Sequence, residues 1–330
     1  MKFFLFLVLL TSICTAIGSA SSQAQNLHEC DGTFSSSLEH IEAVDINCQA
    51  GELLVDDRIT IEVPDFGQSL SVSWILDGTL SGIEDSVLVS HFGPKVLVSN
   101  FDETGAPQVP LSLSNISGLG SYPVNSTDTG CQNDSHSSDL YIFPTGVNWY
   151  YNSIGEPASL SLTRIGNGFT TWKNETNRCG IAPKGNNLVT TYRGTTTSPE
   201  AMGGNPPPDQ IALCSSTREI DGLNVIGWGH LPAGVVAATC LTTIPGGVKE
   251  SDIRFSTDYN WFTQYSSTGC SNAWDLGDIA THEIGHMIGL GHSVAGTDQV
   301  MNPYAYSCNY ANRKLAKGDL LSLSHFYGGN

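Results

Sequence analysis

The residues best suited to chemistry lie in one stretch near the C-terminal end of this 330-residue chain, and they follow the pattern HExxHxxGxxH. His282 and His286 are one helical turn apart, so on a helix their imidazoles share a face and can bind one metal ion. Glu283 would lean over the open side of that ion. Gly289 lets the chain leave the helix sharply, so that His292 can return as a third ligand.

Three nitrogen ligands leave the fourth position of a zinc ion to water, which is the arrangement of catalytic zinc sites. The plain alternative, that these histidines only belong to a buried helix, would require a chance match of five residues at fixed spacing. The stretch therefore predicts one catalytic Zn²⁺ bound by His282, His286 and His292. Glu283 is the predicted general base, taking a proton from water and passing it to the leaving amine.

The pattern resembles that of the metzincin zinc endopeptidases, whose second hallmark is a methionine turn beneath the metal. Residues 300–304, Val-Met-Asn-Pro-Tyr, are similar to that turn, with Met301 as its methionine, although a methionine that only fills the core would look alike. Ser293 resembles the matrixin pattern, and residues 315–328 resemble the closing matrixin helix. Gly318 departs from it, because matrixins usually have Asp there. Asp319 matches and is expected to form a structural salt bridge.

The resemblance implies an α+β metzincin-like domain over residues 138–330, with a twisted mixed sheet and a long zinc helix. Its substrate would be an extended protein or peptide chain. Residues 235–238, Val235, Val236, Ala237 and Ala238, occupy the place of the matrixin edge strand, whose free amides could pair with a substrate, although an ordinary sheet strand would read the same way. Tyr304 is a candidate for stabilising the oxyanion. Strands are expected at 147–151, 188–192, 225–228, 235–241 and 252–255, and a helix within 156–174.

Residues 1–24 read as a signal peptide, which predicts a secreted protein. Residues 25–137 show short alternating segments that predict a β-rich, sandwich-like N-terminal domain, followed by a linker over 118–138. We expect this domain to be a folding aid, an inhibitory prosegment or a binding module. The strands expected within it cover 53–55, 59–63, 70–76, 87–89 and 96–98.

The formal net charge of -18 argues against nucleic acid or an anionic membrane surface as a partner, and the chain is expected to act as a monomer. A different class of function stays open beside the protease. The chain could be a non-catalytic, zinc-containing binding or adhesion protein that uses its N-terminal domain as the binding module.

Eight cysteines follow the predicted signal peptide, which itself contains Cys14, and an even number in an exported chain predicts disulfides. The expected pairs are Cys30 with Cys48, Cys179 with Cys214, Cys240 with Cys270, and Cys131 with Cys308. The sequence around Cys179 also resembles the matrixin cysteine switch, but its place after the first helix favours a disulfide. A second, structural zinc is not expected, because only His230 lies between His136 and His282. Ca²⁺ binding is left open. Sequons stand at Asn115, Asn125, Asn133 and Asn174.

Overall fold

The computed structural model describes two parts of the chain. In the N-terminal part it describes residues 44–46, 53–55, 60–64, 68–78, 86–91 and 96–99. In the C-terminal part it describes residues 127–136, 143, 146–157, 160–200, 212–214, 221–244, 247–266, 268–293 and 296–328. The predicted signal peptide, the Cys30–Cys48 pair and the sequons at Asn115 and Asn125 lie outside these residues.

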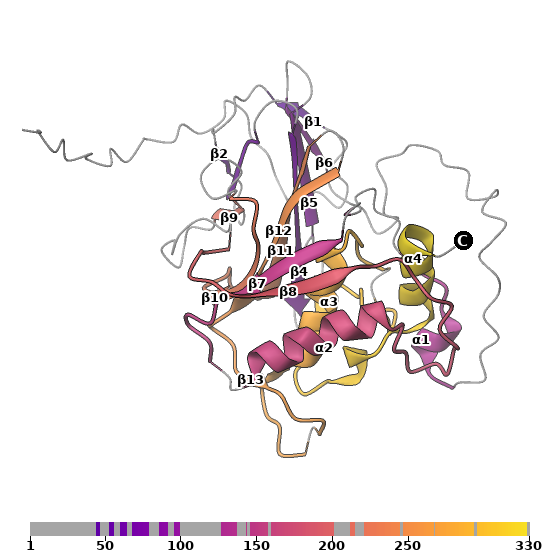
Figure 1. Cartoon of the computed structure of the whole chain (residues 1–330). Coiled ribbons are helices and arrows are strands. Elements are labelled where there is room, and N and C mark those ends of the chain that lie inside the picture. The colour runs from indigo at the N-terminus through magenta and orange to yellow at the C-terminus, as the bar shows by residue number, and fades with distance from the viewer. Residues whose placement is uncertain are drawn as a thin grey trace, which may run out of the picture.

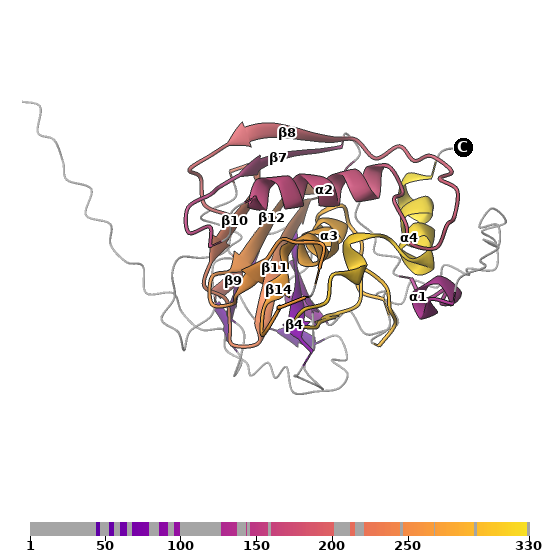
Figure 2. The same cartoon turned by 90° about the horizontal axis from the view of Figure 1, so that it is seen from below.

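Ten of the described strands form one large mixed sheet with helices packed on one face (Figures 1 and 2). Its order is β1-β6-β5-β4-β11-β12-β10-β7-β8, with β15 pairing beside β4. The strands β7, β8, β10 and β12 are mutually parallel, and β11 and the N-terminal strands continue the sheet antiparallel. The C-terminal strands are β7 (Val147–Tyr151), β8 (Thr190–Thr195), β10 (Asn224–Gly229), β11 (Val235–Ile244), β12 (Gly247–Ser256) and β15 (Tyr304–Ala305).

The N-terminal strands other than β1, which was not expected, match the expected segments in position but not in architecture. They are β1 (Val44–Ile46), β2 (Leu53–Val55), β3 (Thr60–Glu62), β4 (Gln68–Asp77), β5 (Ser86–His91) and β6 (Val96–Ser99). The expected sandwich is wrong for β1, β4, β5 and β6, because β4 pairs with β11 from Ser69 to Leu76 and carries the other three strands into the same sheet. A separate small sheet joins β2, β3 and β9 (Ala212–Cys214). The sequence pattern identified β2 to β6 but not β1 or β9, and it did not show where the strands would pair.

Two helices pack on one face of the sheet, and the hydrophobic core lies between them and the sheet. They are α2 (Ser161–Lys173), within the expected range, and α3 (Leu276–Met287), which carries the histidine motif. They pack closely because Gly168 presents no side chain to Ile284, and because the indole of Trp172 donates a hydrogen bond to the carbonyl of Thr281 (2.7 Å). α4 (Lys317–Tyr327) closes the chain, and β13 (Trp261–Phe262), β14 (Trp274–Asp275) and a short 3₁₀ helix (Ala311–Arg313) lead into or support α3.

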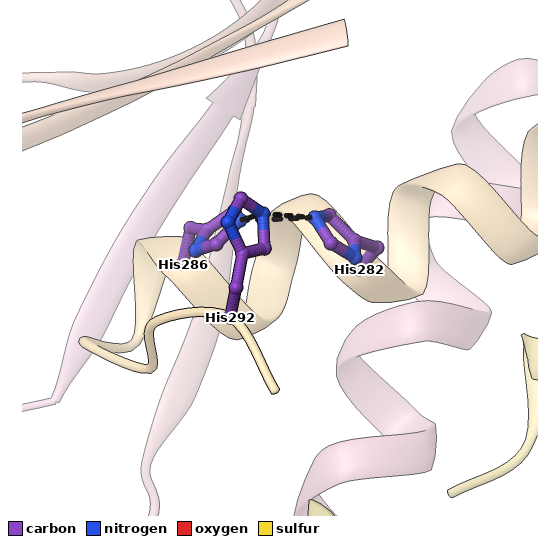
Figure 3. Close-up of side chains that lie close together, drawn as sticks. All are labelled: His282, His286 and His292. Atoms are coloured by element: carbon purple, nitrogen blue, oxygen red, sulfur yellow. Dashed lines mark hydrogen bonds between the residues drawn. The ribbon is translucent and has the colours of Figure 1, made fainter. Parts of the chain in front are cut away.

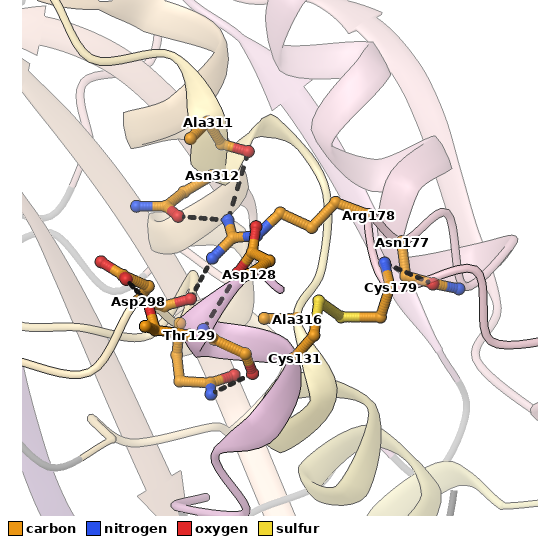
Figure 4. Close-up of polar contacts among 12 residues, drawn as sticks. Asp128, Thr129, Cys131, Asn177, Arg178, Cys179, Asp298, Ala311, Asn312 and Ala316 are labelled. Carbon is orange, nitrogen blue, oxygen red and sulfur yellow. Dashed lines mark hydrogen bonds and ion pairs between the residues drawn. A yellow bond between two sulfur atoms is a disulfide. The ribbon is translucent and has the colours of Figure 1, made fainter. Parts of the chain in front are cut away.

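The expected linker over 118–138 contains a structured segment that is fastened to the C-terminal part. Its helix α1 (Thr129–Gln132) is joined to the loop after α2 by the Cys131–Cys179 disulfide (Figure 4). Arg178 forms an ion pair with Asp128 (3.0 Å), and Gln299 donates a hydrogen bond to the carbonyl of Gly130 (2.9 Å). These contacts contradict a free linker over residues 127–136.

This packing also accounts for the departure at Gly318. A Cβ atom on Gly318 would lie 1.9 Å from the carbonyl oxygen of Ser135, so an acidic side chain has no room there while the segment after α1 lies across the start of α4. The backbone amide of Gly318 instead donates to the side-chain oxygen of Gln299 (3.0 Å). The local difference from the matrixin pattern therefore follows from a contact made by a distant part of the chain.

The disulfides differ from the expected pairs. Cys131 is bonded to Cys179, and Cys270 is bonded to Cys308. The predicted pairs Cys179–Cys214, Cys240–Cys270 and Cys131–Cys308 are therefore wrong, because each contains a cysteine with another partner. Cys240 is also disulfide-bonded, to a cysteine outside the described side chains. The bond at Cys179 rules out its role as a metal-binding switch in this structure.

Candidate metal centre

The structure brings the three motif histidines together at one point beside α3 (Figure 3). The Nε2 atom of His286 lies 2.9 Å from that of His282 and 3.0 Å from that of His292, and the third separation is 3.2 Å. Zinc–nitrogen bonds of 2.0–2.1 Å at tetrahedral angles place such nitrogens roughly 3.3 Å apart. The three atoms therefore have the spacing of ligands that converge on one small cation.

Hydrogen bonds on the far side of two rings fix which nitrogen points inward. Nδ1 of His282 donates to the carbonyl of Val300, and Nδ1 of His286 donates to that of Leu290, each at 2.7 Å. With the proton held at Nδ1, Nε2 keeps its lone pair for a metal. Burial lowers the pKa of both rings well below the usual value, and neighbouring histidines lower it further. Neutral rings with inward lone pairs repel one another unless a cation lies between them, so this donor set fits a metal ion.

Glu283 is fully buried beside the histidines. The hydroxyl of Thr239, on β11, donates a hydrogen bond to Oε2 of Glu283. The other carboxyl oxygen of Glu283, Oε1, has no hydrogen-bond partner among the described residues. Burial raises the pKa of Glu283 to about 8, against the smaller opposite effect of the Thr239 hydrogen bond. An orphaned carboxylate oxygen at this depth is suited to accept a hydrogen bond from a water at the site.

Local backbone features bring His292 next to His282 and His286, as the motif predicts. The helix α3 begins at an Asp275 cap, whose side chain accepts from the amide of Asp278 (2.7 Å). It ends just before Gly289, which has φ +96° and allows a reversal that side chains disfavour. The amide of Leu290 then closes the turn on the carbonyl of Gly285 (2.9 Å).

Met301 packs directly against α3. A Cβ atom on Gly285 would lie 2.3 Å from the Met301 sulfur, so the bare face of the helix at Gly285 makes room for this side chain. The amide of Ser293 donates to the carbonyl of Met301 (2.8 Å), which ties the segment after His292 to the methionine turn. Both contacts fit the predicted placement of the turn next to the three histidines.

Asp319 fastens the methionine turn from α4, although not by the salt bridge that the sequence predicted. Its Oδ2 accepts from the amides of Val300 (2.9 Å) and Ala316 (2.7 Å), and its Oδ1 accepts from that of Met301 (3.2 Å). The same Val300 accepts the His282 proton through its carbonyl. Asp319 therefore supports His282 through one intervening residue.

Replacing Asp319 with Asn is expected to destabilise the fold by about 2–4 kcal/mol. The new amide group would face at least one of three backbone donors, and a buried donor left without an acceptor costs roughly 1–3 kcal/mol. Denaturant unfolding of the metal-free protein measures the change. The control is Asp134→Asn, at a carboxylate that is 67% exposed and ion-paired to Lys317, where a change within about 0.5 kcal/mol is expected. Equal stability of the two variants would contradict the supporting role of Asp319.

Other predicted site residues have mixed outcomes. The expected substrate edge at Val235, Val236, Ala237 and Ala238 is not free, because β11 lies between β12 and β4. Tyr304 lies in β15, where its backbone pairs with β4, and its oxyanion role stays a prediction.

Within the described residues, the three histidines are the only group of at least three His, Cys, Asp or Glu side chains close enough to share a metal. The expectations about a second zinc and about Ca²⁺ remain untested.

Comparison with known proteins places this site in a family context. Residues 232–328 match the Matrixin family model. Metalloendoproteinase 5-MMP of Arabidopsis thaliana is 48% identical over 56 residues, which are 17% of this chain and 15% of that protein. Stromelysin-3 of Mus musculus is 31% identical over 97 residues, which are 29% of this chain and 18% of that protein.

These matches cover less than a fifth of either relative's length. The solved metalloproteinase-II from Bacteroides fragilis aligns over 84% of this chain and 91% of its own, but at 12% identity and a TM-score of 0.29, from which nothing follows about the fold. The segment that contains the histidines, Met301 and α4 is thus matrixin-like, as the sequence motifs predicted. Among the described residues, no helix is long and apolar enough to cross a membrane.

Sequence reasoning missed several residues of the site. Thr239 contacts Glu283 from β11, and Gly285 makes room for Met301. Asp319 was singled out, but with a different partner. A small residue in the middle of the motif could have signalled a close contact at Gly285. Nothing local marks Thr239, because its role depends on how β11 lies against α3.

Proposed function

We propose that this chain is a secreted zinc-dependent endopeptidase that hydrolyses peptide bonds of extended polypeptides. One observation carries the proposal: three imidazole nitrogens converge within 2.9–3.2 Å of one another, and next to them lies a buried glutamate with one oxygen that has no hydrogen-bond partner among the described residues. The match of this segment to the Matrixin family model supports the same reading.

The chemistry divides between the metal and the chain. Zinc, when bound by His282, His286 and His292, would polarise a water molecule and the carbonyl of the bond to be cut. Glu283 would accept a proton from the water and deliver it to the departing amine nitrogen. Thr239 holds one carboxylate oxygen of Glu283 in place, which leaves the other oxygen to carry the proton. The carbonyls of Val300 and Leu290 keep two of the imidazoles correctly oriented throughout.

Metal removal tests the proposal. The purified chain, loaded with one zinc per molecule, is incubated with a peptide library, and the products are identified by mass spectrometry. We expect cleavage of internal peptide bonds that stops when a chelator removes the zinc and returns when zinc is added back. Full zinc occupancy without cleavage would favour the alternative, a non-catalytic zinc-containing binding protein.

A further inference from the structure

The turn that brings His292 back to the candidate metal centre is buried, so its backbone groups need partners from within the protein. Ile288 and Leu290, on either side of Gly289, are at most 1% exposed. The end of a helix leaves its last carbonyls without partners inside the helix, and a buried carbonyl without a donor is costly. The donors that reach this turn therefore decide how firmly it is held.

Tyr327, the last residue of α4, supplies one of these donors. Its hydroxyl donates a hydrogen bond to the carbonyl of Ile288 (2.7 Å). Tyr327 is buried in the same hydrophobic core as Ile288 and Leu290. Burial raises the pKa of Tyr327 to about 12, against the opposite effect of a hydrogen bond with the backbone of Phe143. The hydroxyl therefore stays protonated at neutral pH and keeps its ability to donate.

The carbonyl that Tyr327 holds lies between two of the motif histidines in the chain. Just after it, Gly289 makes the reversal at φ +96°, and the chain then runs back to His292 (Figure 3). The next carbonyl but one, that of Leu290, accepts the Nδ1 proton of His286 (2.7 Å). A displacement of this turn would therefore move His292 and would also move the group that orients the His286 ring.

The other end of α4 acts on the remaining motif histidine. Asp319, in the first turn of α4, accepts from the amide of Val300, whose carbonyl in turn accepts the Nδ1 proton of His282. Asp319 and Tyr327 lie in the first and last turns of one helix, and eight residues of helix span about 12 Å. One helix thus contacts the backbone supports of all three histidines, at two separate points.

We infer that Tyr327 is a positioning residue of the candidate metal centre. Through the carbonyl of Ile288 it sets the turn that places His286 and His292, while Asp319 acts on the remaining histidine from the other end of α4. The inference rests on the proposed zinc site and adds to it a residue outside the histidine motif. The effect of Tyr327 on the metal passes through the backbone, because its hydroxyl contacts a carbonyl of the turn.

The test is Tyr327→Phe, which removes one oxygen atom and leaves the ring in the core. We expect the dissociation constant for zinc to rise about tenfold, at the lower end of the cost of removing an outer partner of a metal ligand. In the metal-free protein, hydrogen exchange at the amides of Gly289 and Leu290 should speed up, because these amides close the turn on carbonyls of α3. With zinc saturating, kcat for a peptide should fall at unchanged KM, since no substrate contact is removed.

Tyr151→Phe is the matched control. Tyr151 is also buried, and its hydroxyl accepts a hydrogen bond from the indole of Trp228 (2.8 Å), which joins β7 to β10 away from the turn. Both substitutions should lower the denaturant midpoint of unfolding, but Tyr151→Phe should leave zinc affinity and exchange at the turn at the parent values. Gly289→Ala, which strains the reversal directly, should weaken zinc binding at least as much as Tyr327→Phe.

The outcomes distinguish a positioning role from a purely structural one. If Tyr327→Phe loses stability as Tyr151→Phe does, but binds zinc as tightly as the parent and keeps the parent exchange at Gly289 and Leu290, the inference is overturned. If the parent chain binds zinc but cleaves no peptide, the proposed activity fails, whereas zinc affinity and hydrogen exchange still decide the role of Tyr327. A parent chain that binds no zinc would overturn the zinc site and this role together.

Discussion

Replacing Glu283 with glutamine is expected to lower peptide hydrolysis by about a hundredfold to ten-thousandfold while zinc stays bound. Glutamine keeps the size of the side chain and can still contact Thr239, but it cannot accept a proton at neutral pH. None of the three histidine nitrogens is altered, so the metal site should form as before. The measurement is kcat/KM on one peptide together with zinc content per chain.

The same substitution at Glu156, which lies in the loop before α2, is the control and should leave both quantities unchanged. Loss of zinc from Glu283→Gln would indicate that this carboxylate is a ligand. Turnover close to that of the parent, with zinc retained, would show that another group takes the proton.

The His292→Ala variant is expected to lose zinc as readily as His282→Ala, with an affinity loss larger than about 100-fold. Removing even an outer partner of a metal ligand typically costs 10–100-fold in affinity, and here a ligand itself is removed. The expectation rests on the Nε2 atom of His292, which lies 3.0 Å from that of His286 and 3.2 Å from that of His282. Competition with a chromogenic chelator measures the dissociation constant for zinc.

His230→Ala is the matched control, because this histidine is exposed and its ring contacts Asp258 (2.7 Å) rather than the motif. Its zinc affinity should equal that of the parent. Tight zinc binding by His292→Ala would mean that the third ligand is elsewhere in the chain, and the proposed mechanism would need a different metal centre.

The sequence by itself determined the residues of the candidate metal centre, because their geometry is local. Two histidines four residues apart share a helix face whatever surrounds them, and Gly289 encodes the reversal that returns His292. All three lie within eleven residues, so few other arrangements of the chain could separate them. Strands with alternating side chains could also be predicted in both parts of the chain, because this period of two is a property of each strand and does not depend on its neighbours.

Partner choice was decided only by the tertiary structure. The sequence of β4 does not encode that it pairs with β11, more than 150 residues later, and it therefore suggested a separate sandwich and a free edge at 235–238. The number of cysteines indicated that disulfides form, but it did not show which cysteines pair. Cys131 meets Cys179 only when α1 packs beside the loop after α2. Asp319 and Thr239 acquire their roles in the same way, through neighbours that only folding brings within hydrogen-bond distance. Pairing between distant segments depends on which surfaces the whole chain buries together, and no local period records that choice.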